Sequence, residues 1–187
     1  QQVQGDQYAA LYSETVTVQL ENDFLPFLYP NQYVNFTPDS KASQLALSLI
    51  DEDTVDVDAL QQIYDYVVSN LTYDYEKADT VTTGYLPDVD ETLKTGTGIC
   101  FDYAALTTAM LRSCDIPCKL QIGYAGDIKH AWIDVYIRSK GWVNQAVSFK
   151  GDTWTLMDPT FDSNSDDKEA IQDYIGDESN YTVQFTR

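Results

Sequence analysis

Two stretches that follow residue 38 carry apolar residues at helical spacing. The first opens near Asp39 or Ser40, and the second follows the acidic run 51–58, which suits the positive end of a helix dipole. Their apolar stripes are Ala42, Leu45, Ala46 and Leu49 in the first, and Leu60, Ile63, Tyr64, Val67, Val68 and Leu71 in the second. Each pattern predicts an amphipathic helix that packs on a core.

A third helical pattern runs from Ile99 to about Ser113 and is apolar on a wider surface than the other two. This width predicts a helix that is buried centrally, and Pro117 stops it. Residues 72–97 precede it and are rich in Thr, Asp, Gly and Tyr with weak periodicity. They predict a long loop, of the kind that is often functional in compact domains.

Strand patterns dominate the second half of the chain. Four strands are expected, at 119–125, 130–138, 141–149 and 153–157, and the short glycine-containing links 139–141 and 150–152 favour an antiparallel meander. In the second of these strands, Ala131, Ile133, Val135 and Ile137 share one face, while His130, Trp132, Asp134 and Tyr136 share the other. A helix over 166–174 and a strand over 181–186 complete the pattern.

The order of these elements indicates one α+β domain spanning residues 1–187, a length that fits a single hydrophobic core. Residues 1–38 form an N-terminal arm in which Glu14 to Leu20 alternates as a strand does, and residues 60–165 form the core. The C-terminal helix and strand occupy residues 166–187.

Charge narrows the classes of partner. The chain has 30 acidic and 11 basic residues and a formal net charge of −19, so it repels phosphate backbones, and nucleic acid is excluded as an expected partner. No apolar run reaches the length of a membrane-spanning helix, and the first residues lack the basic and apolar regions of a signal peptide. We expect either a cytosolic chain or one from which a targeting segment has been removed.

Cys100 is the first candidate for chemistry. It stands at the predicted first turn of the third helix, after Gly96-Thr97-Gly98, where unpaired backbone N–H groups and the helix dipole stabilise a thiolate. Gly98 lets the chain turn sharply and lets a substrate approach the sulfur. Taken alone, Cys100 also fits a buried structural cysteine.

His130 is the sole histidine of the chain, and Asp158 closes the last predicted strand of the meander before Pro159. An aspartate on an adjacent strand can accept the second imidazole N–H and fix its tautomer, while Trp132 shields the ring. Separately, a lone histidine fits a satisfied structural residue and an Asp-Pro pair fits a common turn.

Together the three residues form an ordered set that resembles the transglutaminase-like superfamily, whose core is a papain-like fold. Four segments carry the resemblance: 96–104 around Cys100, 111–117, 129–133 around His130 and 154–160 around Asp158. It implies that Cys100 is the nucleophile, His130 the general base and acid, and Asp158 the orienting carboxylate. It also implies N-terminal helices and a central nucleophile helix packed on an antiparallel sheet.

The activity implied is acyl transfer on amide bonds through a thioester, with hydrolysis favoured over amine crosslinking. The Cys100 backbone N–H and a donor from residues 72–97, for which we select Tyr85, are expected to hold the oxyanion. The alternative is an extracellular binding or scaffold module without turnover. The pattern looks most like exported bacterial proteins, which places the chain outside the cytoplasm.

Neither a cofactor nor a metal is expected. Residues 162–173 begin like a calcium loop, but Asp167 replaces its glycine and Asp173 its closing glutamate, and the cysteines and the histidine lack zinc-ligand spacing. Cys114 and Cys118 either bridge at the Pro117 turn or remain two buried thiols, and Cys100 stays free in both cases. The expected partner is a protein or peptide substrate, including cell-wall peptides, and we expect a monomer.

Overall fold

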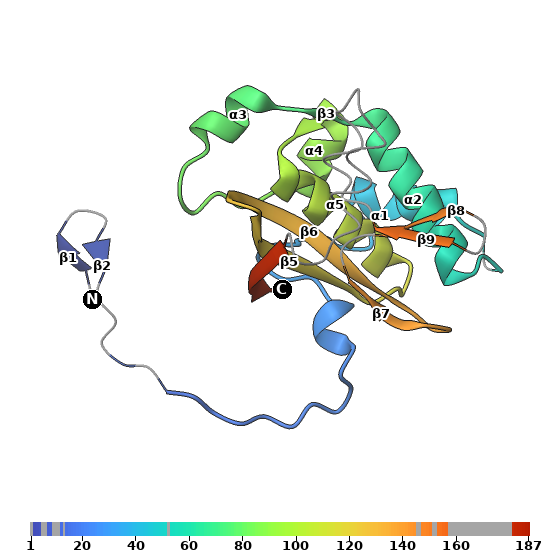
Figure 1. The fold of residues 1–187 in the computed structure, drawn as a ribbon, viewed down its shortest axis with the longest axis horizontal. Coiled ribbons are helices and arrows are strands. Elements are labelled where there is room, and N and C mark those ends of the chain that lie inside the picture. Colours follow the sequence, from blue (N-terminus) through green and yellow to red (C-terminus); the bar gives the residue numbers. More distant parts are fainter. Residues whose placement is uncertain are drawn as a thin grey trace.

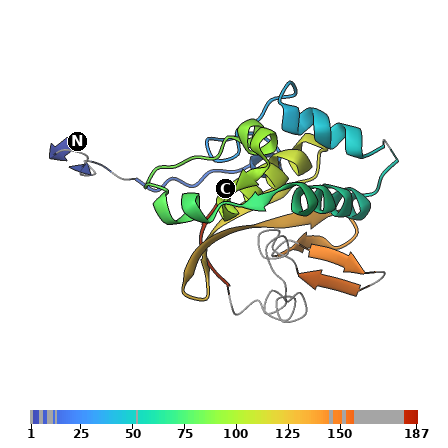
Figure 2. The same ribbon diagram turned by 90° about the horizontal axis from the view of Figure 1, so that it is seen from above.

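The protein is seen in a computed structural model, which describes residues 2–4, 7–8, 12, 14–51, 53–144, 147–150, 153–156 and 181–187. Five α-helices lie on one side of a curled antiparallel sheet (Figures 1 and 2). This arrangement confirms the predicted α+β fold, with helices before strands.

The helical layer holds the three predicted helices and two more. Its members are α1 (Lys41–Leu49), α2 (Asp56–Asn70), α3 (Tyr75–Thr80), α4 (Val89–Thr95) and α5 (Cys100–Ser113), and the 3-10 helix η1 (Leu25–Phe27) precedes them. Helix α5 is the central one, because nearly all of its side chains from Asp102 to Arg112 are buried. Helices α1, α2 and α4 pack around it, α1 and α4 farther from the sheet and α2 beside the sheet.

The main sheet has the strand order β10-β5-β6-β7. Its strands are β5 (Cys118–Ala125), β6 (Ile128–Ile137), β7 (Gly141–Val143) and β10 (Tyr181–Thr186), and each pairs with its neighbour antiparallel. Two-stranded pairs are formed by β1 (Gln2–Gln4) with β2 (Gln7–Tyr8), β3 (Thr72–Tyr73) with β4 (Thr97–Gly98), and β8 (Val147–Lys150) with β9 (Thr153–Leu156). The meander is therefore confirmed for β5, β6 and β7, while the stretch expected as one strand over 141–149 divides between two sheets.

Strand β6 alternates as predicted. Ala131, Ile133, Val135 and Ile137 belong to the same hydrophobic core as α5. Across the hairpin, Leu120 pairs with Ile133 and Gly123 with His130. Because successive side chains of a strand point to opposite faces, His130 and Trp132 share the face that this core does not use.

The prediction of a long loop over residues 72–97 is wrong. These residues form α3 and α4 between two short parallel strands, β3 and β4. Each helix begins at an aspartate: Asp74 accepts the Lys77 N–H at 2.9 Å, and Asp88 accepts two backbone N–H groups. Helices of six and seven residues are too short to show a periodicity, so capping is the signal that identifies them.

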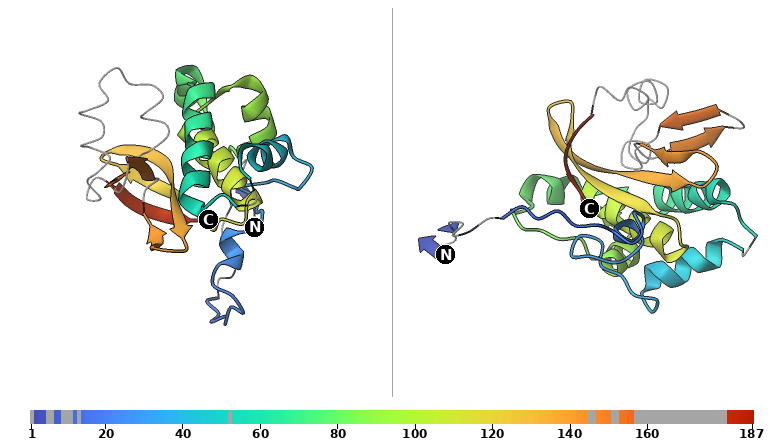
Figure 3. Two further views of the ribbon diagram at one scale, coloured as in Figure 1. Left: turned by 90° about the vertical axis from the view of Figure 1, so that its right-hand side faces the viewer. Right: turned by 90° about the horizontal axis from the view of Figure 1, so that it is seen from below.

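The strand expected at Glu14 to Leu20 is also wrong. The arm is extended there and leads away from the body of the protein, as Figure 3 shows, but no strand among the described residues pairs with it. Val16 and Val18 are 67% and 70% exposed. Alternation without a pairing partner does not make a strand, because the ladder hydrogen bonds are missing. The helix expected over 166–174 lies outside the described residues.

Arg112 ties the C-terminal end of α5 to the rest of the molecule. Its side chain is 2% exposed and donates to three backbone carbonyls, those of Tyr29 (2.8 Å), Cys118 (2.7 and 3.0 Å) and Arg187 (3.0 Å). Burial lowers the pKa of the guanidinium, which nevertheless stays charged at neutral pH because its ordinary value is so high. One side chain thus joins α5 to the arm, to the start of β5 and to the last residue.

We expect Arg112→Met to lower the free energy of unfolding by about 3 kcal/mol or more, because three carbonyls lose a buried donor. Urea unfolding followed by circular dichroism measures this change. Arg138→Ala is the matched control, since its 77% exposed side chain pairs with Asp56 at the surface and its loss should cost less than about 1 kcal/mol. Equal losses in both variants would contradict the anchoring role of Arg112.

Candidate active site

Cys100 is the first residue of α5. Ile99 before it is extended, with φ −98° and ψ 174°, so the chain enters the helix abruptly at the cysteine. Its thiol is free and half-buried, at the edge of the core. The first N–H groups of a helix have no partner within the helix, so this position offers donors to a nearby negative charge.

The other two cysteines are free thiols as well, in agreement with the expectation of two structural thiols. Cys118 is fully buried, and burial raises its pKa to about 12. Burial also raises the pKa of Cys114 to about 11. Both thiols are therefore almost wholly protonated at neutral pH and are poor nucleophiles.

A buried carboxylate, Asp102, holds the first turn of α5. It is 0% exposed, and its Oδ2 accepts the Ile99 backbone N–H at 2.8 Å and the Lys77 ammonium at 2.7 Å. The Tyr85 hydroxyl donates to its other oxygen. Three groups from α5, α3 and the segment before α4 therefore converge two residues from Cys100.

Lys77 and Tyr85 have defined protonation states in this cluster. Burial lowers the pKa of Lys77, but its hydrogen bonds to Asp102 and Tyr85 outweigh burial, and the net pKa is raised. The pKa of Tyr85 is also raised, by burial first and then by its hydrogen bond to Asp102. At neutral pH the cluster therefore contains an ammonium and a neutral phenol.

Gly98 lies against Asp102 with no room for a side chain. A Cβ at this position would lie 2.6 Å from the Cβ of Asp102. On its other side the Gly98 carbonyl accepts the Asp74 N–H at 2.9 Å, and Asp74 caps the helix that carries Lys77. The path of the chain into Cys100 is thus enclosed by a ring of contacts through Asp74, Lys77 and Asp102.

His130 lies near the start of β6 and is buried, with 6% exposure. Its ring stacks on Trp132, with centroids 6.3 Å apart and planes 18° apart, and Trp132 packs edge-on against Tyr181. Trp132 therefore lies against the imidazole, and the ring is less accessible than the half-polar face suggested. Tyr181 contributes because β10 returns to this sheet.

The topology brings Cys100 and His130 to the same end of the molecule. Helix α5 and strand β5 are antiparallel, and the Cys118 thiol contacts the Thr108 hydroxyl at 3.5 Å, which aligns the two elements. From Thr108 back to Cys100 the helix rises about 12 Å. From Cys118 to Gly123, the partner of His130, the strand advances about 17 Å. Cys100 and His130 therefore lie at similar distances along these two elements, while His130 belongs to the face of the sheet that the core with α5 does not use. Their pairing stays a prediction.

The remaining predicted residues divide into two groups. Tyr85 reaches the first turn of α5, but its hydroxyl proton goes to Asp102, so its role as an oxyanion donor stays a prediction. Asp158 lies outside the described residues, as does the stretch 162–173 that begins like a calcium loop.

Sequence reasoning missed Lys77 and assigned no role to Asp102. The position of Asp102 was open to recognition, since an acidic residue at the third position of a helix commonly accepts a backbone N–H before it. Lys77 gave no comparable signal, because its partner is 25 residues away.

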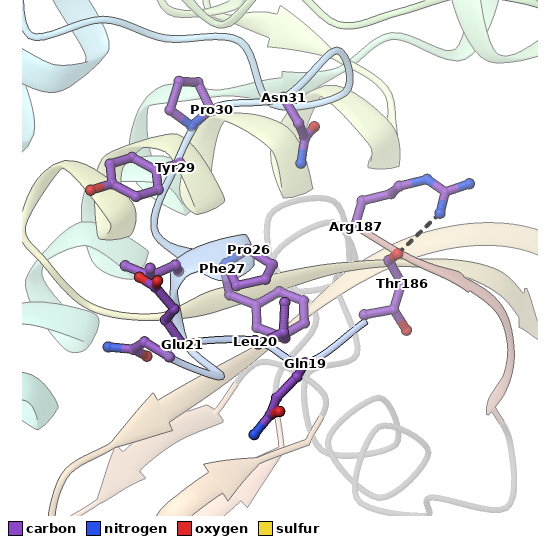
Figure 4. Close-up of a pocket in the computed structure, with 12 residues that line it drawn as sticks. Gln19, Leu20, Glu21, Pro26, Phe27, Tyr29, Pro30, Asn31, Thr186 and Arg187 are labelled. Atoms are coloured by element: carbon purple, nitrogen blue, oxygen red, sulfur yellow. Dashed lines mark hydrogen bonds between the residues drawn. The ribbon is translucent and has the colours of Figure 1, made fainter. Parts of the chain in front are cut away.

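A cavity of about 770 Å³ lies between the arm and the end of β10 (Figure 4). Leu20, Phe27 and Tyr29 line it together with Arg187. Arg112 contacts the Tyr29 and Arg187 carbonyls, which places this cavity at the C-terminal end of α5. None of the predicted site residues lines it, so it is separate from the candidate active site.

Among the described residues, no group of three or more histidine, cysteine, aspartate or glutamate side chains is placed to hold a metal ion. None of the helices in the described part of the chain is both long and apolar enough to cross a membrane.

The sequence of this chain is similar to those of a known protein family and of one curated protein. A family model described as the transglutaminase-like superfamily matches residues 43–159. The UPF0252 protein MJ1282 of Methanocaldococcus jannaschii is 36% identical over 62 residues, which cover 30% of this chain and 18% of that protein.

Two solved structures share the fold. One is a proposed cysteine protease from Cytophaga hutchinsonii, with a TM-score of 0.59 and 22% identity, covering 90% of this chain and 48% of that chain. The other is the periplasmic domain of TgpA from Pseudomonas aeruginosa bound to ethylmercury, with a TM-score of 0.51 and 20% identity, covering 71% and 48%. This chain thus spans about half the length of either solved chain.

We expect iodoacetamide at pH 8 to alkylate Cys100 well before the other two thiols. Cys114, with a pKa of about 11, is thiolate in only about one molecule in a thousand at that pH, and Cys118 in fewer. Peptide mass mapping after short exposure measures the order of labelling. Alkylation of Cys114 should rise about tenfold per pH unit up to its pKa, and faster labelling of Cys114 than of Cys100 at pH 8 would contradict the assignment.

Proposed function

Because the chain belongs to the transglutaminase-like superfamily, we propose that it is a cysteine-dependent enzyme that transfers acyl groups from amide bonds of proteins or peptides. The observation that carries this proposal is the half-buried Cys100 thiol at the first position of a buried helix. A nucleophile at a helix N-terminus and a base on a neighbouring element are what such chemistry needs.

The proposed reaction begins with a Cys100 thiolate and a protonated His130. The sulfur attacks the carbonyl carbon of a carboxamide or peptide, and the carbonyl electrons move onto oxygen. As that tetrahedral intermediate collapses, the carbon–nitrogen bond breaks and His130 gives its proton to the departing amine or ammonia, which leaves a thioester. Asp158 accepts the second imidazole N–H and orients the ring.

The oxyanion is held first by the Cys100 backbone N–H, which the helix leaves available by position. Tyr85 is the proposed second donor, and it would exchange Asp102 for the oxyanion when substrate binds. Gly98 lets the chain pass close to Asp102 on its way into Cys100, since a Cβ at this position would lie 2.6 Å from the Asp102 Cβ. Trp132 covers His130 and limits the access of water to it.

The thioester is then attacked by water, through His130 as base, or by an amine. We propose hydrolysis as the main outcome, with crosslinking as the lesser one. The net charge of −19 and the resemblance to exported bacterial proteins support a location outside the cytoplasm. Cell-wall peptides are candidate substrates there. We propose that the protein works as a monomer without a cofactor or metal.

The test is incubation with a glutamine-containing peptide library, with and without a labelled amine, followed by mass spectrometry. Amine incorporation, ammonia release and backbone cleavage change the mass differently, so one experiment separates the three activities. We expect Cys100→Ala to abolish all of them and His130→Gln to lower kcat/KM by about 100- to 10,000-fold. Asp158→Asn should lower kcat/KM in the same direction.

Cys114→Ala is the matched control, because it removes a thiol that has no proposed part in the reaction and should keep activity. Turnover that persists in Cys100→Ala would sink the proposal. The alternative, a binding module, is favoured if the wild type shows no turnover while Cys100→Ala retains the biological effect of the protein.

A further inference from the structure

The first turn of α5 contains an electrostatic conflict. Asp102 stabilises the turn by accepting the Ile99 N–H, and it does so as a fully buried carboxylate two residues from Cys100. A negative charge close to a thiol disfavours its ionisation. A serine or asparagine would accept the same N–H without that charge. The carboxylate therefore needs compensation if Cys100 is to react as a thiolate.

Lys77 supplies a positive charge at this point. Its Nζ lies 2.7 Å from Asp102 Oδ2 and 2.7 Å from the Tyr85 hydroxyl, and it also lies 4.5 Å from the centre of the Tyr85 ring. Helix α3, which carries Lys77, is fixed by the Asp74 cap, and Asp74 itself binds the Gly98 carbonyl. The two hydrogen bonds of Asp74 thus fix the helix that carries Lys77 relative to Gly98, two residues before Cys100.

We propose that Lys77 is a positioning residue for the nucleophile: its ammonium neutralises Asp102, so that Asp102 caps the helix without suppressing the Cys100 thiolate. This inference rests on the proposed function in one respect, the assignment of Cys100 as the nucleophile. It assigns Lys77 an electrostatic role that is separate from substrate binding and proton transfer.

Among the described residues, the titratable side chains on the elements around the start of α5 include Asp74 at the cap of α3, Tyr73 on β3 and Tyr85, while His130 lies on β6. Lys77 is the lysine that contacts Asp102, and it stays charged at neutral pH because its pKa is raised. A change of residue 77 or 102 should therefore act on the thiol through their mutual charge.

The test measures the rate at which iodoacetamide alkylates Cys100 as a function of pH. Sulfur displaces iodide, so the rate follows the thiolate fraction. In Lys77→Met the carboxylate keeps two donors, the Ile99 N–H and the Tyr85 hydroxyl, but loses its counter-ion. We expect about 3- to 10-fold slower alkylation at pH 7, with the pH profile displaced to higher pH.

Asp102→Asn should act in the opposite direction, because it leaves the ammonium without its anion: alkylation at pH 7 should be about 3- to 10-fold faster. The double variant Lys77→Met with Asp102→Asn should return close to the wild-type rate. Lys94→Met is the matched control, since its exposed pair with Glu91 lies on α4 and its removal should not change the rate. Lys77→Arg keeps the charge and should also keep the rate.

The proposal predicts that the two single variants change the rate of Cys100 alkylation in opposite directions. If Lys77→Met and Asp102→Asn both slow alkylation, and the double variant shows no recovery, the pair is only a structural clamp and the inference is overturned. Thermal unfolding checks that each variant is folded, and if Lys77→Met does not fold, the faster rate of Asp102→Asn against an unchanged Lys77→Arg carries the test.

Alkylation needs no substrate, so this inference fails independently of the proposed function. A wild type that does not turn over peptides, yet shows opposite signs in the two variants, would overturn the activity and leave the charge compensation standing. A wild type that does turn over, with unchanged alkylation in Lys77→Met, would overturn the charge compensation alone.

Discussion

The burial of α5 on almost every side is the constraint on which the rest of the structure depends. Helices α1, α2 and α4 and strands β5 and β6 all pack against it. Buried helix ends need polar partners. Asp102 accepts the Ile99 N–H at one end, and Arg112 at the other end donates to backbone carbonyls outside the helix, with each charge placed as the helix dipole favours.

The two ends of α5 carry different chemical groups. The N-terminal end holds the Cys100 thiol, the ion pair of Lys77 with Asp102 and the Tyr85 phenol. The C-terminal end holds the buried guanidinium and, beyond it, the apolar cavity under the arm. The arm therefore contributes to the anchoring of the helix and lies away from the candidate active site.

Much of this organisation was predictable from periodicity. Helices α1, α2 and α5 are long enough to show an apolar stripe, and the hairpin of β5 and β6 shows clear alternation. Helices α3 and α4 were not predictable in this way, because aspartate caps rather than apolar spacing define them. The N-terminal arm is the opposite case. Its residues 14–20 alternate as a strand does, but no strand among the described residues pairs with them.

The candidate site was predictable only where a single residue carries the chemistry. Cys100 and its place on the first turn follow from the local sequence. The contact between Lys77 and Asp102 does not, because it depends on how α3 folds back over α5 across 25 residues. Gly98 lies between these cases: its need for flexibility was expected, whereas the structure shows that the lack of space beside Asp102 is the stricter requirement.

The pairing of β10 with β5 bears on the order in which the protein folds. The hairpin of β5 and β6 is local, but Tyr181 pairs with Ala125 across most of the second half of the chain. Contacts between distant residues form late, since a long loop must close first. Thr182 then passes so near Gly123 that a Cβ there would clash with its carbonyl at 1.9 Å. The final environment of the strand opposite His130 therefore depends on a pairing that must close a far longer loop than the local hairpin of β5 and β6.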